Sequence, residues 1–167
     1  MVGLKKKVRN EIVLYDNHAE IILYNRRCEE TARALIDLED VDKVKNIKWC
    51  MKSNGYVHDG KIHIHRLIMD CSDNMVVDHI NHNKLDNRKT NLRICSHRQN
   101  SMNQKTRRDN SSGHAGVGKS GNKWRARIYI DGKEVHLGRF DTKEEAIRAR
   151  KQAELEHYGE YRNQDED

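Results

Sequence analysis

The segment from Val76 to Arg93, VVDHINHNKLDNRKTNLR, concentrates side chains that can bind a metal ion or take up a proton. Two valines lead into Asp78 and His79, and several asparagines follow. Carboxylate and carboxamide oxygens are hard ligands, suited to Mg²⁺ or a similar cation that also takes a substrate phosphate. A histidine with an ordinary pKa of about 6.5 can accept a proton from water at neutral pH. With nearby Lys and Arg side chains, these groups could hydrolyse a phosphodiester.

Three elements would have to bring such groups together. The run MVVD predicts a strand that delivers Asp78 and His79 at its end, and N-L-R predicts a second strand. Ser96 is a good N-cap for a helix over SHRQNSMNQKTRR, from which Asn100 can face back toward the strand end. Asp, Asn and His are also common in turns, because they hydrogen-bond their own backbone. A lone Asp-His pair would therefore indicate a turn, whereas the complete set favours a site.

Charge is unevenly distributed along the chain. Lys84 to Arg139 contains 14 Lys and Arg against 4 Asp and Glu, while the whole 167-residue chain has a formal net charge of +6. A basic centre between more acidic segments predicts a polyanionic partner. Nucleic acid is favoured over a membrane surface because the sequence has no amphipathic or apolar anchor.

The sequence shows no targeting signal and no membrane-length apolar run, so we expect a cytoplasmic protein of a bacterial or phage-infected cell. The four cysteines are far apart and form no CxxC pair, which argues against a zinc site and a disulfide framework. We expect buried or half-buried free thiols at all four positions.

Turn signals divide the rest of the first half. EIVLYDNHAEIILY predicts a hairpin around an Asp-Asn-His turn, and ALIDLEDVDKVKNIKW predicts a strand end at Leu35–Leu38 followed by a short helix. GYVHDGKIHIHRLIMD predicts a second hairpin, with a turn at Asp59-Gly60 and an alternating return strand over residues 62–65.

The C-terminal part predicts three strands and a helix packed on them. KWRARIYI alternates, so that Trp124, Ala126, Ile128 and Ile130 share one face and Arg125, Arg127 and Tyr129 the other. Asp131-Gly132 predicts a two-residue turn into KEVHLGRF. Asp141 or Thr142 caps a helix that Tyr158-Gly159 ends.

The segments HRLIM and VVDHINHNKLDNRKTNLRICSHRQNSMNQ, over about residues 45 to 105, resemble the zinc-free HNH endonucleases of phages and mobile introns. The resemblance implies a ββα-metal (His-Me finger) fold that uses one Mg²⁺ or Mn²⁺ ion, with no zinc. It implies that His79 is the general base, that Asp78 and Asn100 bind the metal, and that Asn91 orients the loop bearing the histidine. The implied reaction is attack of a His79-activated water on phosphorus.

Several positions leave alternatives open. The family usually has glycine at His82, which suggests a positive φ that histidine tolerates at some cost; a phosphate contact by His82 is the alternative. His97 could replace or assist Asn100. His65 and Arg66 could touch phosphate or brace the site, and Arg93 is expected to contact DNA.

Residues 112 to 161 resemble the APETALA/ethylene-response-factor type of DNA-binding domain. Gly116-Val117, Lys123-Trp124, Ile128, HLGRFDT and the alanine-rich helix carry this resemblance. It implies a three-stranded sheet that enters the major groove of double-stranded DNA. The expected contacts are Lys123, Trp124, Arg125, Arg127, Tyr129 and Arg139. The family's base-reading arginines are absent at Ala115 and Gly118, so contacts to the DNA backbone should dominate.

Together these features predict an α+β protein with a bracing segment (1–47), an HNH nuclease domain (48–106), a linker (107–112), a DNA-binding module (113–163) and an acidic tail (164–167). The predicted activity is a homing or mobile-element endonuclease that acts as a monomer or dimer on DNA, where the tethered module raises the local concentration of the nuclease. The rival class is a DNA-binding regulator with a retired HNH scaffold, against which the retention of all four motif residues counts. An RNA-binding protein is disfavoured, because the chain has a single Phe and few aromatic residues for stacking.

Overall fold

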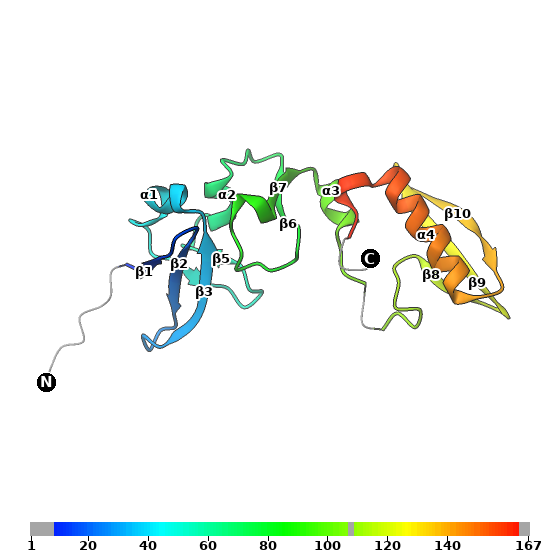
Figure 1. The fold of residues 1–167 in the computed structure, drawn as a ribbon, viewed down its shortest axis with the longest axis horizontal. Coiled ribbons are helices and arrows are strands. Elements are labelled where there is room, and N and C mark those ends of the chain that lie inside the picture. Colours follow the sequence, from blue (N-terminus) through cyan, green and yellow to red (C-terminus); the bar gives the residue numbers. More distant parts are fainter. Residues whose placement is uncertain (1–8, 107–108, 164–167) are drawn as a thin grey trace, which may run out of the picture. The chain divides into compact units, whose positions relative to one another are not determined.

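The computed structural model describes residues 9–106 and 109–163. Its first compact unit ends at His97 and its second begins at Arg98 (Figure 1). Helices and small antiparallel sheets make up both units, which confirms the expected α+β class. No helix among the described residues is long and apolar enough to cross a membrane.

The first unit begins with a three-stranded antiparallel sheet. Its strands are β1 (Ile12–Leu14), β2 (Ala19–Tyr24) and β3 (Glu30–Ile36), in the order β1-β2-β3. β1 and β2 form the expected hairpin around the Asp-Asn-His turn. A 3-10 turn, η1 (Leu38–Asp40), and a short helix, α1 (Val41–Val44), follow β3, as the sequence predicted.

The second predicted hairpin is wrong in its return strand. β5 (Val57–His58) pairs with the preceding β4 (Cys50–Met51), and after the Asp59-Gly60 turn the chain enters the helix α2 (Ile64–Ile68). Only the isolated bridge between His58 and His63 remains of the hairpin. The alternation over residues 62–65 was too short to exclude a helix, and helical geometry buries Ile64 and Ile68 on one side.

The segment singled out by its chemistry forms a two-stranded antiparallel sheet followed by a helix. β6 (Val76–His79) pairs with β7 (Leu92–Cys95), and the turn η2 (Lys89–Asn91) leads into β7. α3 (His97–Met102) begins directly after Ser96, at the predicted place, and is shorter than predicted. The order strand, loop, strand, helix is the ββα arrangement that the resemblance implied.

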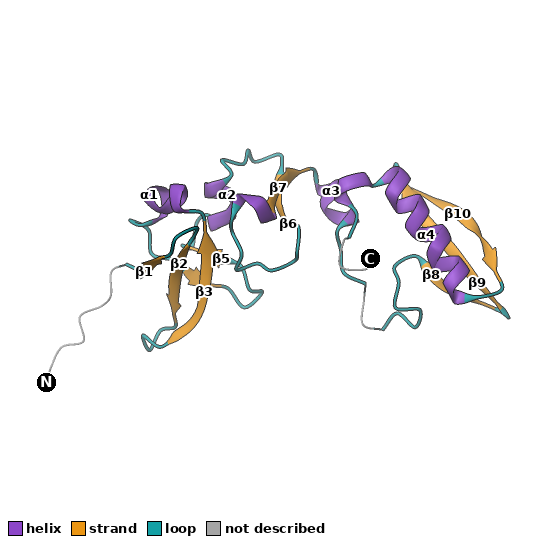
Figure 2. Cartoon of the chain, in the orientation of Figure 1, coloured by secondary structure: helices purple, strands orange, loops and turns teal. Residues whose placement is uncertain are grey.

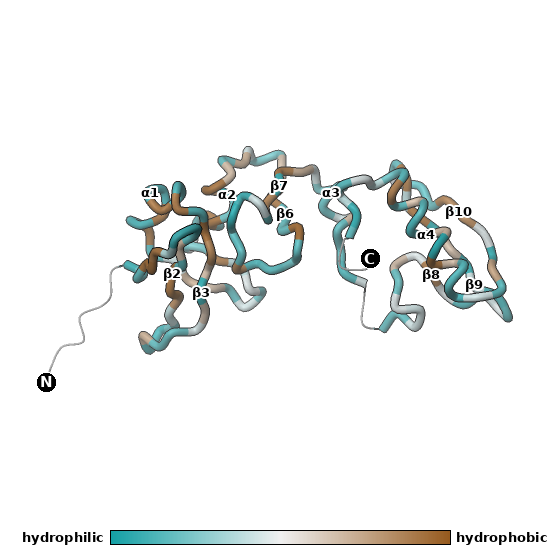
Figure 3. The backbone as a smooth tube through the Cα atoms, in the orientation of Figure 1, coloured by the Kyte–Doolittle hydropathy of each residue, from teal (hydrophilic) through white to brown (hydrophobic). Residues whose placement is uncertain are grey.

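One hydrophobic core joins the N-terminal sheet to the later elements of the first unit. Ile21, Leu23 and Ile36 pack in the same cluster as Ile64 and Val77. Figure 3 shows the hydrophobic character of β2, β3 and α1. The boundary expected at residues 47 and 48 therefore does not separate two bodies, and the N-terminal segment is built into the fold that carries β6.

The second unit contains the predicted module of three strands and a helix (Figure 2). β9 (Lys123–Ile130) lies between β8 (Val117–Ser120) and β10 (Lys133–Phe140), and α4 (Lys143–His157) packs on the sheet. Asp131 and Gly132 both have positive φ, as the predicted two-residue turn requires. Thr142 and Glu145 form a reciprocal capping box at the start of α4, and the turn η3 (Gly159–Tyr161) follows the helix.

Gly116 is required at the start of this module. Its φ is +75°, and a Cβ atom there would lie 2.4 Å from the carbonyl oxygen of Arg127. The close approach allows the N–H of Arg127 to donate to the carbonyl of Gly116 at 2.9 Å. Only glycine satisfies both the conformation and the spacing.

All four cysteines are free thiols, and one differs from the expectation. Cys95 is buried and Cys50 and Cys71 are half-buried, but Cys28 is exposed at a positive-φ position between β2 and β3. The expected linker lies partly, and the acidic tail entirely, outside the described residues.

Candidate active site and nucleic-acid interface

β6 delivers Asp78 and His79 as its last two residues, and both are buried. The register with β7 places Asp78 opposite Arg93 and His79 opposite Leu92. Leu92 belongs to the hydrophobic core, so the strand pair is anchored directly beneath the histidine. The site is therefore held by regular structure at its base and by the loop of residues 80–91 above it.

The carboxylate of Asp78 is paired with a guanidinium from the neighbouring strand. Nε and Nη2 of Arg93 donate to Oδ2 of Asp78 at 3.0 and 2.7 Å. The pair leaves 12% of the Arg93 side chain and 9% of the Asp78 side chain exposed. Because both side chains are nearly buried, each charge is compensated mainly by its partner and little by water.

Asn91 holds the loop at both ends. Its Oδ1 accepts from the N–H of Asn81 at 3.0 Å, and its Nδ2 donates to the carbonyl of Asp86 at 2.8 Å. Its own carbonyl accepts from the N–H of Ile80 at 2.9 Å. Asn91 is itself buried, so these three bonds tie both ends of the loop to the start of β7.

The imidazole of His79 lies in an aromatic pocket. The ring of His65 meets it edge to face at 5.1 Å between centroids, and the ring of Tyr56 lies at 5.8 Å. Burial lowers the pKa of His79, while the hydrogen bond to Asn87 and the charge of Asp78 act in the opposite direction. His79 is therefore neutral at physiological pH and able to accept a proton.

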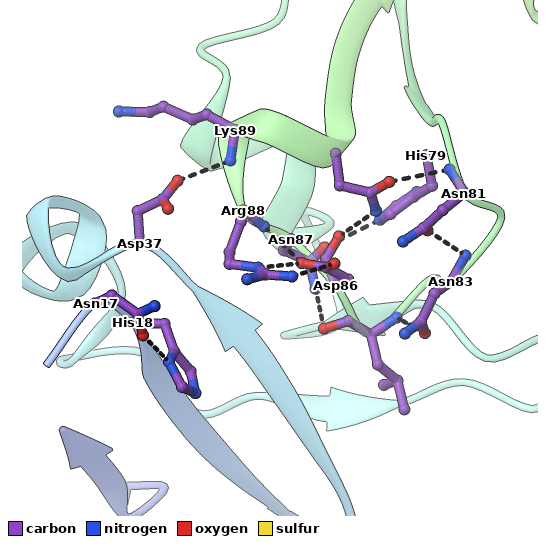
Figure 4. A network of polar contacts seen from close by, with 12 residues as sticks. Asn17, His18, Asp37, His79, Asn81, Asn83, Asp86, Asn87, Arg88 and Lys89 are labelled. Carbon is purple, nitrogen blue, oxygen red and sulfur yellow. Dashed lines mark hydrogen bonds and ion pairs between the residues drawn. The ribbon is translucent and has the colours of Figure 1, made fainter. Parts of the chain in front are cut away.

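Nε2 of His79 lies 3.2 Å from Oδ1 of Asn87, which is fully buried (Figure 4). The neighbouring carboxylate, Asp86, is paired with Arg88 through two 2.8 Å contacts, and this pairing lowers the pKa of Asp86. Asp86 is thereby bound within the loop, and among these side chains Asp78 and His79 are the pair that the sequence analysis expects to act.

Asn100 lies on α3, half-buried, and His97 is the exposed first residue of the same helix. Within the described residues, no group of three or more His, Cys, Asp or Glu side chains could hold a metal ion. Mg²⁺ does not need such a group, because it keeps several water ligands and binds through one or two protein oxygens. The oxygen of Asp78, beside a neutral histidine, fits an ion of this kind.

A family model for the HNH endonuclease matches residues 47–102, which include β6, β7 and α3. The chain is also 33% identical, over 138 residues, to a protein of Acanthamoeba polyphaga mimivirus named as an uncharacterized HNH endonuclease; the match covers 77% of this chain and 72% of that protein. This chain belongs to the HNH endonuclease family. No solved structure matches it.

His65 and Arg66, which precede the motif segment in the chain, have different surroundings. His65 is buried between Tyr56 and His79, and its Nδ1 has no hydrogen-bond partner among the described residues. Arg66 donates to the carbonyls of Met75, Cys71 and Ser72, at 2.9, 3.2 and 2.9 Å. These contacts favour a bracing role for Arg66, since it holds the turn that leads into β6.

The positive φ expected at His82 is confirmed at 60°. Two further side-chain contacts around the site could not be predicted from the sequence. The first is the contact of Asn87 with His79, which comes from the polar run DNR. The second is the edge-on and tilted packing of Tyr56 against His63, His65 and His79, with Nζ of Lys84 4.3 Å from the centre of its ring. These contacts join residues far apart in the sequence, and no periodic pattern marks them.

The outward face of the C-terminal sheet is basic. The cross-strand pairs Arg125–Arg139 and Arg127–His136 lie on the face opposite the buried Ala126 and Ile128. Two of the residues predicted to contact DNA form ion pairs. Arg127 pairs with Glu134, and Lys123 pairs with Asp141 at 2.9 Å. We call this surface the basic face: it comprises Lys123, Arg125, Arg127, Tyr129, His136 and Arg139, together with Glu134, which accepts hydrogen bonds from Arg127 and Tyr129.

Trp124 is the exception among the predicted DNA contacts. It packs with the core cluster of Val117, Ala126 and Ala146, on the side of the sheet that α4 covers. Nζ of Lys119 lies 5.7 Å from the centre of its ring. The structure thus gives Trp124 a packing role and places it on the face opposite Arg125.

Proposed function

We propose that this chain is a divalent-metal-dependent DNA endonuclease of homing or mobile-element type. The observation that carries the proposal is a buried, neutral His79 adjoining Asp78, which is paired with Arg93, at the end of β6 and beside a loop clamped by Asn91. His79 accepts the proton of the attacking water, and Asp78 supplies a carboxylate oxygen to the metal ion. The family resemblance assigns Asn100 as the second protein ligand.

The metal ion, when bound, stabilises the charge that develops on the phosphate and on the leaving 3′ oxygen. Mg²⁺ or Mn²⁺ suits the oxygen of Asp78 and the amide of Asn100. The protein's own part is to keep His79 neutral by burial and to fix the loop through Asn91. The burial of His79 also keeps its imidazole in one orientation, against His65 and Tyr56.

The DNA substrate is proposed to be held by the basic face of the second unit. Lys and Arg side chains release counterions when they contact phosphates, which supplies affinity with little sequence dependence. The cationic face and the strand alternation support an interface of the APETALA type. The family model ends at residue 102, so this assignment rests on the module's own residues.

Relaxation of supercoiled plasmid tests the nuclease function. Purified protein should nick or linearise DNA with Mg²⁺ and not with chelator, and His79→Ala should lose cleavage while retaining DNA affinity. His82→Gly is a matched control, since it removes an imidazole from the same loop and suits the positive φ at that position. It should cleave like the wild type.

A library of random DNA duplexes should accompany the plasmid, so that a rare target site is represented. Cleavage that survives in His79→Ala would contradict the assigned base. Tight binding without cleavage of any duplex, under any divalent metal, would replace the nuclease by a DNA-binding regulator.

A further inference from the structure

The buried side chain of Asn87 can be oriented in only one way in its hydrogen-bond network. Its Nδ2 lies 3.1 Å from the carbonyl oxygen of Leu85 and 3.4 Å from that of Lys84, and both are acceptors. The other end of the amide, Oδ1, faces Nε2 of His79 at 3.2 Å. Exchanging the two ends would bring the amide oxygen against two carbonyl oxygens, so Oδ1 is fixed as the acceptor.

An acceptor at that position selects one form of the neutral imidazole. Nε2 of His79 must carry the hydrogen that Oδ1 of Asn87 accepts, which leaves the basic lone pair on Nδ1. A 180° flip of the ring would put Cε1 in the place of Nε2 and so lose the hydrogen bond to Asn87. Figure 4 shows His79 and Asn87 side by side above Asp86.

The backbone of Asn87 is held by the N-terminal sheet. Its N–H donates to the carbonyl of Leu35 on β3 at 2.8 Å, and the N–H of Leu35 donates to the carbonyl of Leu85 at 2.8 Å. Leu35 and Asp86 form a parallel bridge. Close by, the carboxylate of Asp37 accepts from the N–H of Lys89 at 2.7 Å. The loop segment 85–89 is therefore attached to the end of β3 through one parallel bridge and the side chain of Asp37.

We infer that Asn87 is a positioning residue that holds His79 in the Nε2–H form and so presents Nδ1 as the base, and that β3 of the N-terminal sheet fixes Asn87 for this task. The inference rests on the proposed function for its catalytic meaning. Its physical content, the tautomer of His79 and its dependence on Asn87, does not depend on cleavage. The N-terminal segment thereby acquires a role in the active site without contacting the reacting atoms.

The ring ¹⁵N chemical shifts of His79 test the tautomer, because they distinguish a protonated from an unprotonated imidazole nitrogen. Metal-free full-length protein, with His79→Gln to assign the signals, should show His79 in the Nε2–H form at neutral pH. Asn87→Leu removes the acceptor with similar volume and should shift His79 toward a mixture of tautomers. Asn87→Gln keeps a carboxamide, which can accept from His79 and donate to the loop carbonyls, and should retain the Nε2–H form.

The same variants are then compared in single-turnover cleavage. Asn87→Leu should lower the rate by roughly 10²-fold, the lower end of what a general base contributes, with DNA affinity within twofold of the wild type. Asn87→Gln should recover part of that rate. Asn74→Ala, which changes an exposed asparagine whose Oδ1 accepts from Ser72, should change neither the tautomer nor the rate.

A wild-type His79 in the Nδ1–H form would overturn the inference, as would an Asn87→Leu protein with unchanged tautomer and rate. Should Asn87→Leu fail to fold, the tautomer of His79 in the wild type and in Asn87→Gln still decides the inference. Should the wild type cleave no DNA, the proposed function fails, while the chemical shifts still report on the contact between Asn87 and His79.

Discussion

Arg93 and Asp78 form a nearly buried ion pair across the two strands of the ββα unit, in which both donors of the guanidinium reach the same carboxylate oxygen. Removing one partner of such a pair is costly because the remaining charge stays in a poorly hydrated place. We expect Arg93→Ala to lower the free energy of unfolding by on the order of 3 kcal/mol, measured by urea denaturation.

Divalent metal should stabilise Arg93→Ala more than it stabilises the wild type. With the guanidinium gone, Asp78 attracts a cation more strongly, so millimolar Mg²⁺ should raise the melting temperature of Arg93→Ala by more than that of the wild type. Adding Asp78→Asn to Arg93→Ala should abolish this difference. An equal Mg²⁺ response in all three proteins would show that Asp78 does not bind the ion.

Asn91 should be needed for both stability and rate. Asn91→Ala removes the bonds to Asn81 and Asp86, which at about 1 kcal/mol each predicts a loss of about 2 kcal/mol in unfolding free energy. The released loop should also exchange its amide hydrogens faster at Asn81, and cleavage should slow. Asn91→Asp keeps the acceptor for the N–H of Asn81, so its free energy of unfolding should fall by less than that of Asn91→Ala. A loop that exchanges at the wild-type rate in Asn91→Ala would be inconsistent with a clamp.

The basic face should account for the salt dependence of DNA binding. Arg125 and Arg139 lie opposite each other on β9 and β10. Replacing both by Ala should weaken binding similarly for unrelated DNA sequences and reduce the slope of log K against log salt by roughly 2, about one unit for each phosphate that the protein no longer neutralises. Binding would be measured by fluorescence anisotropy at several salt concentrations.

Arg148→Ala, which removes an exposed arginine from α4 on the other side of the sheet, is the matched control and should leave the slope unchanged. An unchanged slope in the Arg125 and Arg139 double variant would move the interface away from this face. A loss confined to one DNA sequence would instead indicate that these arginines read bases.

The C-terminal module could be predicted almost completely because its signals are local and agree with one another. The alternation in β9, the Asp131-Gly132 turn and the Thr142–Glu145 capping box each fix a neighbouring stretch of chain. The return strand after Gly60 was mispredicted because residues 62–68 satisfy two periodicities, and burial of Ile64 and Ile68 selected the helix. Local propensity did not decide between them.

The motif residues of the active site were recognisable because their types and order are unusual, whereas their surroundings were not. The addition of residues 85–89 to β3 depends on backbone hydrogen bonds, which leave no pattern in the side chains. Asn87 could be read as one more turn asparagine, and only the fold brings it to His79. The pairing of Arg93 with Asp78 is also a matter of register, because a shift of one residue would send Arg93 to the other face.

His65 should make the stability of the fold fall in acid. Burial, followed by the charges of His79, His63 and Arg66, lowers the pKa of His65 to about 3, against about 6.5 in an unfolded chain. The unfolded state therefore binds more protons between these values, and the stabilisation present at neutral pH is lost as the pH falls from about 6.5 toward 3. The loss between pH 7.5 and pH 5 attributable to His65 should be about 2 kcal/mol. Urea denaturation at the two pH values, for the wild type and for His65→Phe and His65→Gln, isolates this contribution; both variants should lose less stability than the wild type, and by similar amounts. If all three proteins lose the same stability, His65 is not held neutral by the fold.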